Sequence, residues 1–410
     1  MNRSPDRNSR RGRTAEVILT SAASGIGRID RNECTLDDFL DTGILPEYRR
    51  TAGHLLLTYY RYAGYIRKEL SRLVRRPPEN KIRHLLLAAM TQIRFQTGIA
   101  RESAVSIAVD AARSSHADKF VNAVLRRFIA EDVPPVSTAA EILPPAVFNR
   151  WKKRFSPEEL DDLARLFQSE PPFTFRMEKQ TEEVDFDCAF LCRTGNFDFY
   201  TASPALVLKS RALQEGKIYI QDPATGNAPS LPDYASVKSA LDLCAAPGGK
   251  SLMISERLSF DGKLTAFDRS RIRQKLTLEN FQKRNLKHLV KWGDPHELAG
   301  VFDLVLADVP CSNTGVFRHR PDALWRFSVN ELQKVVQLQT DLLEQAARLT
   351  VPGGQLVYST CSIEPEENQL LIDDFLIRHP EFELLSGGTI LPSGNADGSS
   401  AFLLRSKKSR

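Results

Sequence analysis

Two cysteines of this chain stand in closely similar surroundings, each among small polar residues. Cys311 lies in "ADVPCSNTG" and Cys361 lies in "VYSTCSIEPEEN", and each segment follows what reads as the end of a strand. A cysteine thiolate can act as a nucleophile and divide one difficult reaction step into easier ones. A free thiol has a pKa of about 8.5, so such a cysteine needs surroundings that help it ionise. Whether the two thiols share one site depends on the elements that position them.

A glycine-rich turn in "LDLCAAPGGKS" is a second candidate for chemistry. Gly248 and Gly249 let the backbone approach a ligand closely, and the helix that follows offers free N–H groups. The spacing matches neither the P-loop nor the GxGxxG dinucleotide fingerprint. A glycine turn alone is weak evidence, because many strand-to-helix turns need glycine for steric reasons.

Acidic residues follow this turn at the expected ends of the next two strands. Asp268 in "TAFDRS" lies eighteen residues after Lys250, and a carboxylate there can accept both ribose hydroxyls of a nucleoside cofactor. Asp294 in "KWGDP" stands where the third strand should end, within reach of an adenine edge. The glycine turn and the two acids together favour a nucleoside site. Either a dinucleotide or S-adenosylmethionine would suit it.

A parallel sheet is needed to bring these residues to one edge. From about Ser239 short apolar runs alternate with helical stretches, and the runs are "SALDLCA", "KLTAFD", "FDLVLADVP" and "GQLVYSTCS". This alternation predicts a doubly wound, Rossmann-like α/β sheet, in which ligands bind beyond the carboxyl ends of the strands. Upstream, "FTFRMEK" reads as a strand. Apolar residues at helical spacing predict helices within 54–74, 81–97, 101–115, 119–131 and 148–167.

Charge and composition narrow the class of protein. Residues 1–135 hold 23 Lys and Arg against 15 Asp and Glu, whereas the whole chain has a net charge of only +5. A basic first third favours an anionic partner, most often nucleic acid, although solvated helix faces and an arginine-rich tail would give the same excess. Six scattered cysteines without zinc spacing, no secretory leader and no long apolar segment predict a cytoplasmic protein with reduced thiols.

Several motifs together resemble the Sun/Fmu (RsmB-like) family of RNA cytosine-carbon-5 methyltransferases. The resemblance rests on "LDLCAAPGGKS", "ADVPCSNTGVFRHRPDALWR" and "YSTCSIEPEENQ", with "QDPATGNAP" similar to a segment that precedes the first motif. "FTFRMEK" resembles a preceding strand of the family, except that Met177 and Glu178 replace the usual Val-Asn. "ARESAVSIAVDAARSSHADKFVNAVLRRF" is similar to the NusB-like RNA-binding domain of the branch that methylates 16S ribosomal RNA.

The resemblance implies a role for each candidate residue. Cys361 would add to carbon 6 of the cytosine, and Cys311 would assist release of the product. Asp308 would hydrogen-bond the base at N3 and the amino group. S-adenosylmethionine would be the cofactor. Its binding residues would be Cys244, Ala245, Ala246, Pro247, Gly248, Gly249, Lys250, Asp268, Asp294 and Asp308.

Other residues keep a structural reading beside the functional one. Lys250 would neutralise the methionine carboxylate, or else cap a helix or face solvent. Arg318, His319 and Arg320 would hold RNA phosphates, or else form a solvated loop. Trp325 is equally consistent with a buried core residue and with a platform on which an RNA base stacks. For Cys34, Cys188 and Cys192 we expect packing roles, and Cys244 within the turn is mostly a packing residue.

Together with the resemblance, the sequence predicts a monomeric, metal-free methyltransferase that acts on a cytosine in RNA. The expected RNA is 16S ribosomal RNA. We expect a disordered basic tail over 1–13, a NusB-like helical domain over 14–135, a small α+β linker domain over 136–235 and a Rossmann-like catalytic domain over 236–410. Two alternatives remain, a transfer RNA methyltransferase and an inactive RNA-binding or ribosome assembly factor. The inactive factor would be expected to lack one of the two cysteines or Asp308.

Overall fold

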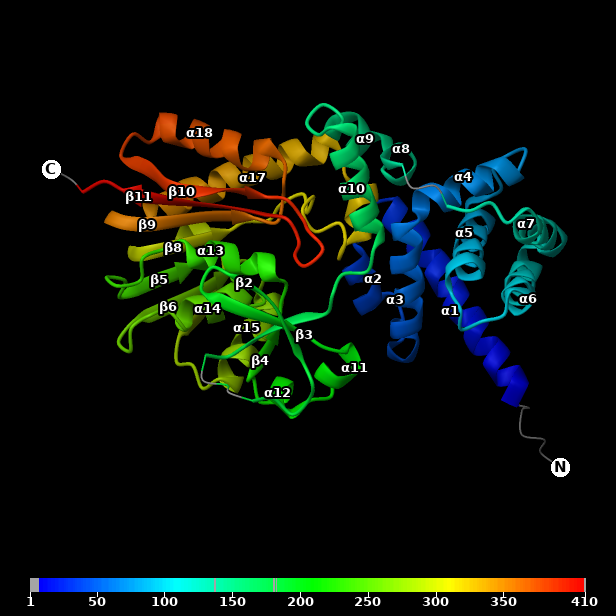
Figure 1. Cartoon of the computed structure of the whole chain (residues 1–410), viewed down its shortest axis with the longest axis horizontal. Helices are drawn as coiled ribbons and strands as arrows, with labels where there is room; N and C mark the ends of the chain where they lie inside the picture. Colours follow the sequence, from blue (N-terminus) through cyan, green and yellow to red (C-terminus); the bar gives the residue numbers. More distant parts are fainter. Residues whose placement is uncertain (1–6, 136–137, 180, 182, 409–410) are drawn as a thin grey trace. The chain divides into compact units, whose positions relative to one another are not determined.

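The computed structural model describes residues 7–135, 138–179, 181 and 183–408. The chain forms two compact units. The helical unit contains the chain up to Glu170 together with Phe317–Ser328, and the α/β unit contains Pro171–Val316 and Val329–Arg410. None of the described helices is long and apolar enough to cross a membrane. Figure 1 shows the helices of the first unit and the strands of the second.

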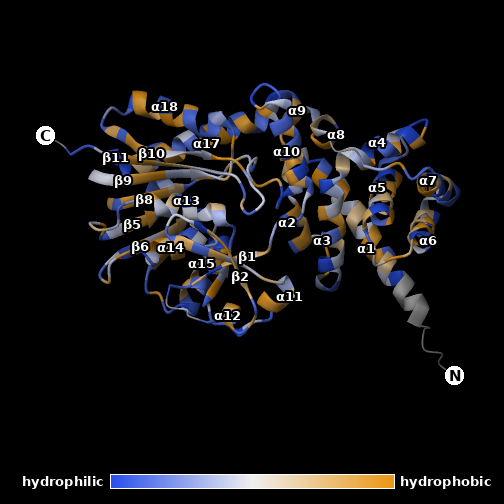
Figure 2. Cartoon of the chain, in the orientation of Figure 1, coloured by the Kyte–Doolittle hydropathy of each residue, from blue (hydrophilic) through white to orange (hydrophobic). Residues whose placement is uncertain are grey.

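The helical unit is built around α5, whose side chains are buried along almost its whole length. Leu86, Ala89 and Met90 of α5 are fully buried, and they pack with apolar residues of α1, α3, α6 and α7. Figure 2 shows that these helices carry both hydrophobic and hydrophilic residues, as expected for helices with one face toward a core. The helices are α1 (Arg7–Asp30), α2 (Leu36–Thr42), α3 (Pro46–Arg61), α4 (Ala63–Leu73), α5 (Asn80–Phe95), α6 (Arg101–Ala112) and α7 (Asp118–Glu131).

The boundaries differ from those expected from the sequence at two places. Helix α1 begins at Arg7, inside the predicted disordered tail, and residues 1–6 lie outside the described part of the chain. The helical unit continues to Glu170, well beyond the expected end at residue 135, because it includes α8 (Ala139–Ile142), α9 (Pro145–Trp151) and α10 (Pro157–Gln168). The predicted linker domain over 136–235 is therefore divided between the two units.

Aromatic packing explains why the helical unit holds both α10 and a segment from much later in the chain. Trp151 of α9 stacks on Phe317 with ring centroids 5.9 Å apart, and Phe167 of α10 meets the same ring at 5.5 Å. All three side chains are nearly or completely buried. Such aromatic side chains bury large apolar areas and hold the elements that carry them.

The inserted segment Phe317–Ser328 contains the short helix α16 (Pro321–Arg326). Trp325 donates its indole N–H to the carbonyl oxygen of Tyr60 at 2.8 Å, and the guanidinium of Arg67 lies 4.5 Å from the centre of its ring. Asp322 accepts a hydrogen bond from the backbone N–H of Leu36 at 3.2 Å. Trp325 thus has a packing role, and the chain that leaves the Cys311 loop at Val316 enters the helical unit directly.

The α/β unit begins with a small antiparallel sheet in the strand order β2-β3-β1-β4. Strand β1 is the predicted "FTFRMEK" strand, whereas its three partners were not predicted. The strands are β1 (Thr174–Met177), β2 (Ala189–Thr194), β3 (Phe197–Thr201) and β4 (Ile218–Ile220). Short helices α11 (Pro204–Val207), α12 (Arg211–Gln214) and α13 (Asn227–Ser230) complete this part.

The main sheet has seven strands in the order β10-β11-β9-β8-β5-β6-β7. Strands β5 to β9 pair in parallel, as predicted, whereas β10 and β11 are antiparallel additions at one edge. The strands are β5 (Ser239–Asp242), β6 (Lys263–Asp268), β7 (Leu289–Trp292), β8 (Phe302–Asp308), β9 (Thr350–Thr360), β10 (Phe382–Ile390) and β11 (Ser399–Ser406). The helices are α14 (Gly249–Ser255), α15 (Arg271–Lys283), α17 (Val329–Arg348) and α18 (Gln369–Arg378).

Both faces of this sheet are covered, and this explains the nearly continuous apolar runs of its strands. Val305 and Ala307 of β8 pack in one cluster with residues of α17 and α18, and Leu304 and Leu306 pack in another with residues of α13 and α14. Successive side chains of a strand point to opposite faces. Burial on both faces fixes the register that places the carboxyl ends of β5, β6, β8 and β9 together.

Candidate active site

The glycine turn joins β5 to α14. Gly248 has φ +99°, a left-handed conformation that side chains with a Cβ rarely adopt. A Cβ on Gly249 would lie 2.8 Å from the amide nitrogen of Gln221. Residue types with larger side chains would therefore disturb the turn at both positions. The backbone N–H groups at the start of α14 follow directly, as the sequence predicted.

An acid at the carboxyl end of β5 was missed by the sequence reasoning, although it lies within the motif. Asp242 is 1% exposed and accepts a hydrogen bond from the hydroxyl of Ser251 at 2.6 Å. Its Oδ1 atom is buried and makes no hydrogen bond. Burial raises the pKa of Asp242 to about 7. An acidic residue that ends a strand just before a glycine turn was the available signal.

Asp268 ends the neighbouring strand β6 and is 2% exposed. Its Oδ1 accepts hydrogen bonds from the N–H of Ser270 at 2.8 Å and from the guanidinium of Arg273 at 2.9 Å. Its Oδ2 faces the N–H of Ala246 in the glycine turn at 3.3 Å. Asp268 therefore lies beside the turn, and its carboxylate is shared with a flexible arginine side chain that ribose hydroxyls would have to displace.

Asp294 follows β7, as predicted, and begins a short 3₁₀ helix by accepting a hydrogen bond from the N–H of His296 at 2.9 Å. It lines a separate hollow of about 400 Å³ together with Phe267 and Trp292. The structure places Asp294 at the correct strand end, but it gives no direct contact between Asp294 and the glycine turn.

Lys250 and Asp308 form an ion pair between α14 and the end of β8. The Nζ of Lys250 lies 2.6 Å from Oδ2 of Asp308, and the hydroxyl of Ser359 donates to Oδ1 at 2.6 Å. Burial favours the neutral amine, but the Asp308 carboxylate outweighs it and raises the pKa of Lys250. Lys250 was expected to face the cofactor carboxylate. In the structure it holds the carboxylate that the sequence assigned to the cytosine.

The two cysteines meet. The Sγ atoms of Cys311 and Cys361 are 3.0 Å apart, and the thiol of Cys361 also donates to Oδ1 of Asn313 at 3.2 Å. The hydrogen bond with Cys361, together with burial, raises the pKa of Cys311 well above its usual range. A second thiol is thus held in its neutral form beside Cys361. The two motifs therefore lie at one location, a question that the sequence alone left open.

A buried carboxylate ties the two cysteine loops together. Glu367 is fully buried, and its Oε1 accepts a hydrogen bond from the N–H of Ser312 at 2.8 Å and from the amide of Gln339 at 3.0 Å. Its Oε2 accepts hydrogen bonds from the hydroxyls of both Ser312 and Ser362, the residues that follow the two cysteines. Burial raises the pKa of Glu367. The hydroxyl residues that flank both cysteines were the sequence signal for this link.

The two loops also approach each other through their backbones. The N–H of Gly315 donates to the carbonyl oxygen of Cys361 at 2.9 Å. A Cβ on Gly315 would lie 2.8 Å from that oxygen and 2.5 Å from the carbonyl oxygen of Gly398. Only glycine fits between these groups without a shift of the backbone, so Gly315 permits the approach of the two sulfur atoms.

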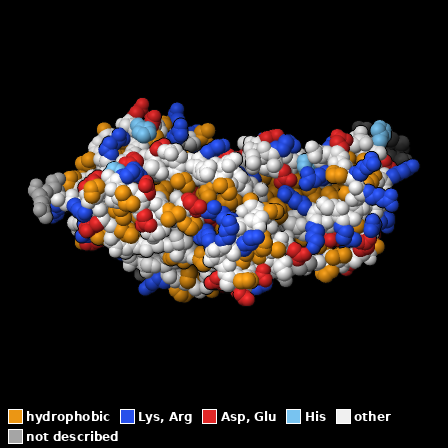
Figure 3. Space-filling model, turned by 90° about the horizontal axis from the view of Figure 1, so that it is seen from above, with side chains coloured by type: hydrophobic (Ala, Val, Ile, Leu, Met, Phe, Trp, Pro, Cys, Tyr) orange, Lys and Arg blue, Asp and Glu red, His pale blue; other side chains and the backbone are white. Residues whose placement is uncertain are grey.

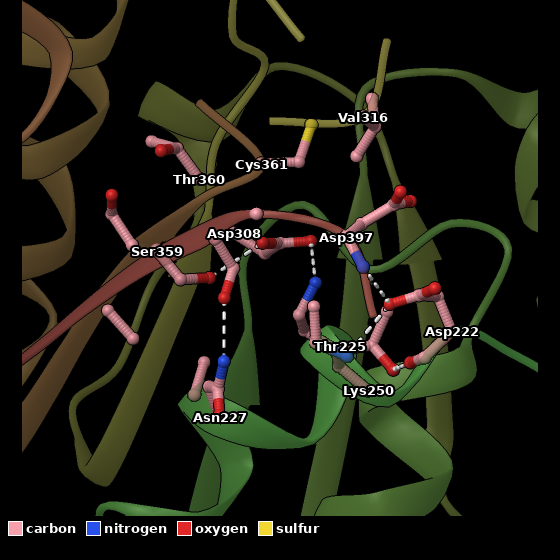
Figure 4. Close-up of a pocket in the computed structure, with 16 residues that line it drawn as sticks. Asp222, Thr225, Asn227, Lys250, Asp308, Val316, Ser359, Thr360, Cys361 and Asp397 are labelled. Atoms are coloured by element: carbon pink, nitrogen blue, oxygen red, sulfur yellow. Dashed lines mark hydrogen bonds and ion pairs between the residues drawn. The ribbon is translucent and has the colours of Figure 1, made fainter. Parts of the chain in front are cut away.

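Cys361 and the Lys250–Asp308 pair line the same small cavity of about 50 Å³, which Figure 4 shows. Asp222 and Asp397 line it as well, and the N–H of Asp397 donates to Asp222 at 3.0 Å. These two acids were not predicted as site residues. They add two carboxylates to the lining of this cavity.

The remaining predicted residues lie elsewhere. Arg318 donates to the carbonyl oxygen of Glu170 at 2.7 Å inside the helical unit, so this guanidinium is not presented to a phosphate, in contrast to the expectation. Arg320 is exposed and lies 3.3 Å from Asp37, and His319 is exposed. Cys244 is partly buried against the apolar core of the sheet, and burial raises the pKa of its thiol. The structure therefore supports a packing role for Cys244.

The residues at this sheet edge suit S-adenosylmethionine. The left-handed turn at Gly248 leaves no room for side chains, Asp268 lies beside the turn, and Asp242 keeps one buried oxygen without a partner. A nucleoside with a charged amino acid portion offers hydroxyl and ammonium donors for such carboxylates. Strand β5, which leads into the turn and α14, lies between β8 and β6, where the strand order reverses. Open α/β sheets bind ligands beyond the carboxyl ends of the strands at such a point.

Comparisons with known proteins agree with this site. A sequence profile described as 16S rRNA methyltransferase RsmB/F matches residues 233–404, and the profile of the NusB family matches residues 15–130. "Ribosomal RNA small subunit methyltransferase B" of Klebsiella pneumoniae is 30% identical over 344 residues, which cover 78% of this chain and 79% of that protein. The protein of the same name from an Escherichia coli strain is 29% identical over 345 residues, covering 78% and 80%.

Solved structures show the same fold. The structure titled "Crystal Structure of PH0851" has a TM-score of 0.76 and 24% identity, and the match covers 95% of this chain and 98% of that chain. NSun6 from Pyrococcus horikoshii with SFG has a TM-score of 0.53 and 19% identity, covering 65% and 99%. The sequence relatives show that the chain belongs to the RsmB/F family of ribosomal RNA methyltransferases, as an S-adenosylmethionine-dependent enzyme with a NusB-like helical region.

Proposed function

We propose that the enzyme methylates carbon 5 of a cytosine in 16S ribosomal RNA through a covalent adduct between Cys361 and carbon 6 of the base. The observation that carries the proposal is the 3.0 Å approach of two thiols beside the Lys250–Asp308 pair. Carbon 5 of cytosine is too poor a nucleophile to take a methyl group unaided. A thiolate bonded to carbon 6 makes carbon 5 enamine-like, which is the benefit of covalent catalysis here.

The addition step uses Cys361 and Asp308. S-adenosylmethionine supplies the electrophilic methyl group when it is bound beside the glycine turn. Cys361 Sγ forms a bond to carbon 6, and the electron pair of the ring double bond becomes available at carbon 5. Asp308 is fixed on one side by Lys250 and on the other by Ser359, so its carboxylate is oriented before the base arrives. The amino group of the base donates a hydrogen bond to Asp308. The proton that Cys361 loses passes to N3 by way of Asp308, and protonation of N3 favours the added intermediate. The target base must leave its stack to reach this cavity.

The release step uses Cys311. Cys311 first gives its own proton to solvent, and its thiolate then takes the proton from the methylated carbon 5. The electron pair of the broken C–H bond re-forms the double bond between carbons 5 and 6, and Cys361 departs as a thiolate that regains the proton from N3. In the free enzyme the hydrogen bond with Cys361 is the largest cause of the raised pKa of Cys311. The adduct turns Cys361 into a thioether, which weakens this hydrogen bond. The pKa of Cys311 therefore falls at the stage that needs a base.

The substrate assignment rests on the whole chain. The NusB match over residues 15–130 and the RsmB/F match over residues 233–404 lie in one chain, and a relative aligned over 78% of it is named for ribosomal RNA methylation. Bisulfite sequencing of RNA from cells with and without the protein tests the assignment. One cytosine of 16S ribosomal RNA is expected to lose its methyl group in the cells without the protein. Loss of methylation confined to transfer RNA would show that transfer RNA is the substrate and 16S ribosomal RNA is not. Unchanged methylation in all RNA would contradict the proposal.

A further inference from the structure

We propose that a cavity of the helical unit holds one nucleotide of the RNA substrate, with the phosphate at the start of α5. The proposal rests on the enzyme being an RNA methyltransferase, and it adds a second contact site far along the chain from the cysteines. The cavity has a volume of about 360 Å³ and is lined by α1, by the first turns of α5 and by Ala111 of α6. Small-molecule sites usually occupy about 300–1,000 Å³.

The electrostatics of this cavity favour an anion. Three cationic residues line it, Arg28 and Arg31 from α1 and Lys81 from α5, and no described acidic residue does. Burial lowers the pKa of His84, so this imidazole adds a neutral hydrogen-bonding group. The Nε atoms of Arg28 and Arg31 lie 3.6 Å and 2.6 Å from the carboxylate of Glu33, so two guanidinium groups share one acid. Figure 3 shows Lys and Arg side chains spread over the helical unit.

The start of α5 adds backbone donors. This helix has sixteen residues, and its N-cap residue makes no side-chain capping hydrogen bond. The N–H of Arg83, bonded to the carbonyl oxygen of Glu79 at 2.8 Å, is the first that the helix itself satisfies. The N–H groups of Asn80, Lys81 and Ile82 precede it, and all three residues line the cavity. The start of a helix binds phosphate through such N–H groups and through the helix dipole.

His84 is an independent sign of a ligand. Its side chain is only 9% exposed and lines the cavity, and it has no hydrogen-bond partner among the described residues. The ring packs directly on α1, because a Cβ on Gly27 would lie 2.8 Å from Nδ1. A buried imidazole without a partner is costly unless something else supplies its hydrogen bond. Asp30, the acid that acts on it electrostatically, is already bound by Arg67 at 2.9 Å.

The other walls suit a base or a sugar rather than a bare ion. Ala23, Ile82 and Leu85 are buried apolar residues of the lining, and Ala111 adds a fourth apolar contact. The N–H groups at the start of α5 suit the phosphate of a nucleotide, and the apolar part of the lining suits its base or sugar. The basic charge of the unit and the RNA substrate of the enzyme select a nucleotide within an RNA chain over a free one.

The test compares RNA binding by full-length variants. Lys81→Ala removes a cation of the cavity, and Ser24→Glu places a negative charge in its lining on the exposed side of α1. Lys119→Ala, which removes an exposed charge from α7, is the matched control. The probe is a labelled transcript of 16S ribosomal RNA, titrated at several salt concentrations, with circular dichroism to verify folding.

We expect Lys81→Ala to weaken RNA binding about tenfold and to lower the slope of log K against log salt by about 1, and Ser24→Glu to weaken it further. Lys119→Ala should change affinity less than twofold. At saturating RNA, the methyl-transfer rate of Lys119→Ala should equal that of the wild type. Because binding is measured without turnover, an inactive wild-type enzyme would contradict the proposed function and leave this test intact.

Two outcomes would overturn the proposal. Unchanged affinity and salt slope in both folded cavity variants would show that RNA does not enter the cavity. Adenosine monophosphate that shifts the NMR signals of His84, with RNA affinity equal in all variants, would assign the cavity to a free nucleotide instead.

Discussion

The sulfur atoms of Cys311 and Cys361 lie 3.0 Å apart, although fifty residues separate them in the chain. Two thiolates at this distance would repel each other strongly, so one sulfur remains protonated when the other ionises. The raised pKa of Cys311 identifies it as the sulfur that keeps its proton. The geometry thus gives the two cysteines different states before any substrate binds, and this asymmetry matches the two roles proposed for them.

Removal of each cysteine should stop the reaction at a different stage. Without Cys361 no bond to carbon 6 forms, so Cys361→Ala should leave labelled RNA free on a denaturing gel with S-adenosylmethionine present. Without Cys311 the addition and the methyl transfer still occur but release slows, so Cys311→Ala should accumulate an adduct that survives denaturation. S-adenosylhomocysteine should bind both variants as it binds the wild type.

The opposite pattern would reverse the roles. A shifted band only with Cys361→Ala would make Cys311 the nucleophile. No trapped complex with either variant, together with a lower melting temperature for Cys311→Ala, would mean that Cys311 only fills space.

Glu367 should act as a positioning residue for the two loops. Glu367→Gln keeps the size of the side chain but replaces one acceptor oxygen by an N–H₂ group, so a serine hydroxyl or N–H loses its partner. A buried donor without a partner costs about 1–3 kcal/mol. We expect the rate of adduct formation to fall at least tenfold, with unchanged affinity for S-adenosylhomocysteine and RNA.

The control for Glu367→Gln is Glu366→Gln, which alters the adjacent carboxylate in the same turn. It should keep nearly normal adduct formation. A purely structural role for Glu367 would lower the melting temperature without changing adduct formation in the folded protein.

The sequence predicted the catalytic sheet well because its signals are local. Acidic residues at strand ends singled out Asp268, and the paired motifs of the family resemblance singled out Asp308, Cys311 and Cys361 as candidates. The structure places all four at the carboxyl ends of the strands or in the loops that follow them. Two features depended on contacts distant in the sequence. Glu367 bonds residues of both cysteine loops, and Trp325 bonds the carbonyl oxygen of Tyr60.

The compact helical unit extends beyond residue 135 for a related reason. The prolines at 134–135 and 144–145 suggested a break, but α9 and α10 carry large aromatic residues whose partner, Phe317, comes from a segment 150 residues later in the chain. No local pattern reveals such a partner. The antiparallel strands β10 and β11 were also missed, because their residues continue a parallel sheet without a crossover helix between them.

Asp268 should control cofactor affinity. Asp268→Ala removes charge-assisted hydrogen bonds to the ribose, each of about 1.5–3 kcal/mol, so S-adenosylhomocysteine should bind at least tenfold more weakly in calorimetry. Arg273→Ala frees the carboxylate from its ion pair and should bind the ligand as tightly as the wild type or more tightly. An unchanged dissociation constant for Asp268→Ala would mean that Asp268 does not bind the ribose.

Asp242 should make the stability of the α/β unit fall as pH rises. Its pKa is raised from 3.8 to about 7 in the folded protein, so folding takes up a proton between these values and the stability that this group provides is lost as pH rises through them. The loss between pH 5 and 7 is on the order of 2–3 kcal/mol.

Asp242→Asn resembles the protonated acid and can still accept the hydrogen bond from Ser251. Its melting temperature by calorimetry, relative to the wild type, should therefore increase by several degrees from pH 5 to pH 8, since about 1 kcal/mol corresponds to 2–4 °C in a unit of this size. The exposed Asp261→Asn should show no such trend. A difference between Asp242→Asn and the wild type that stays constant or shrinks over this range would mean that Asp242 is already ionised at pH 5.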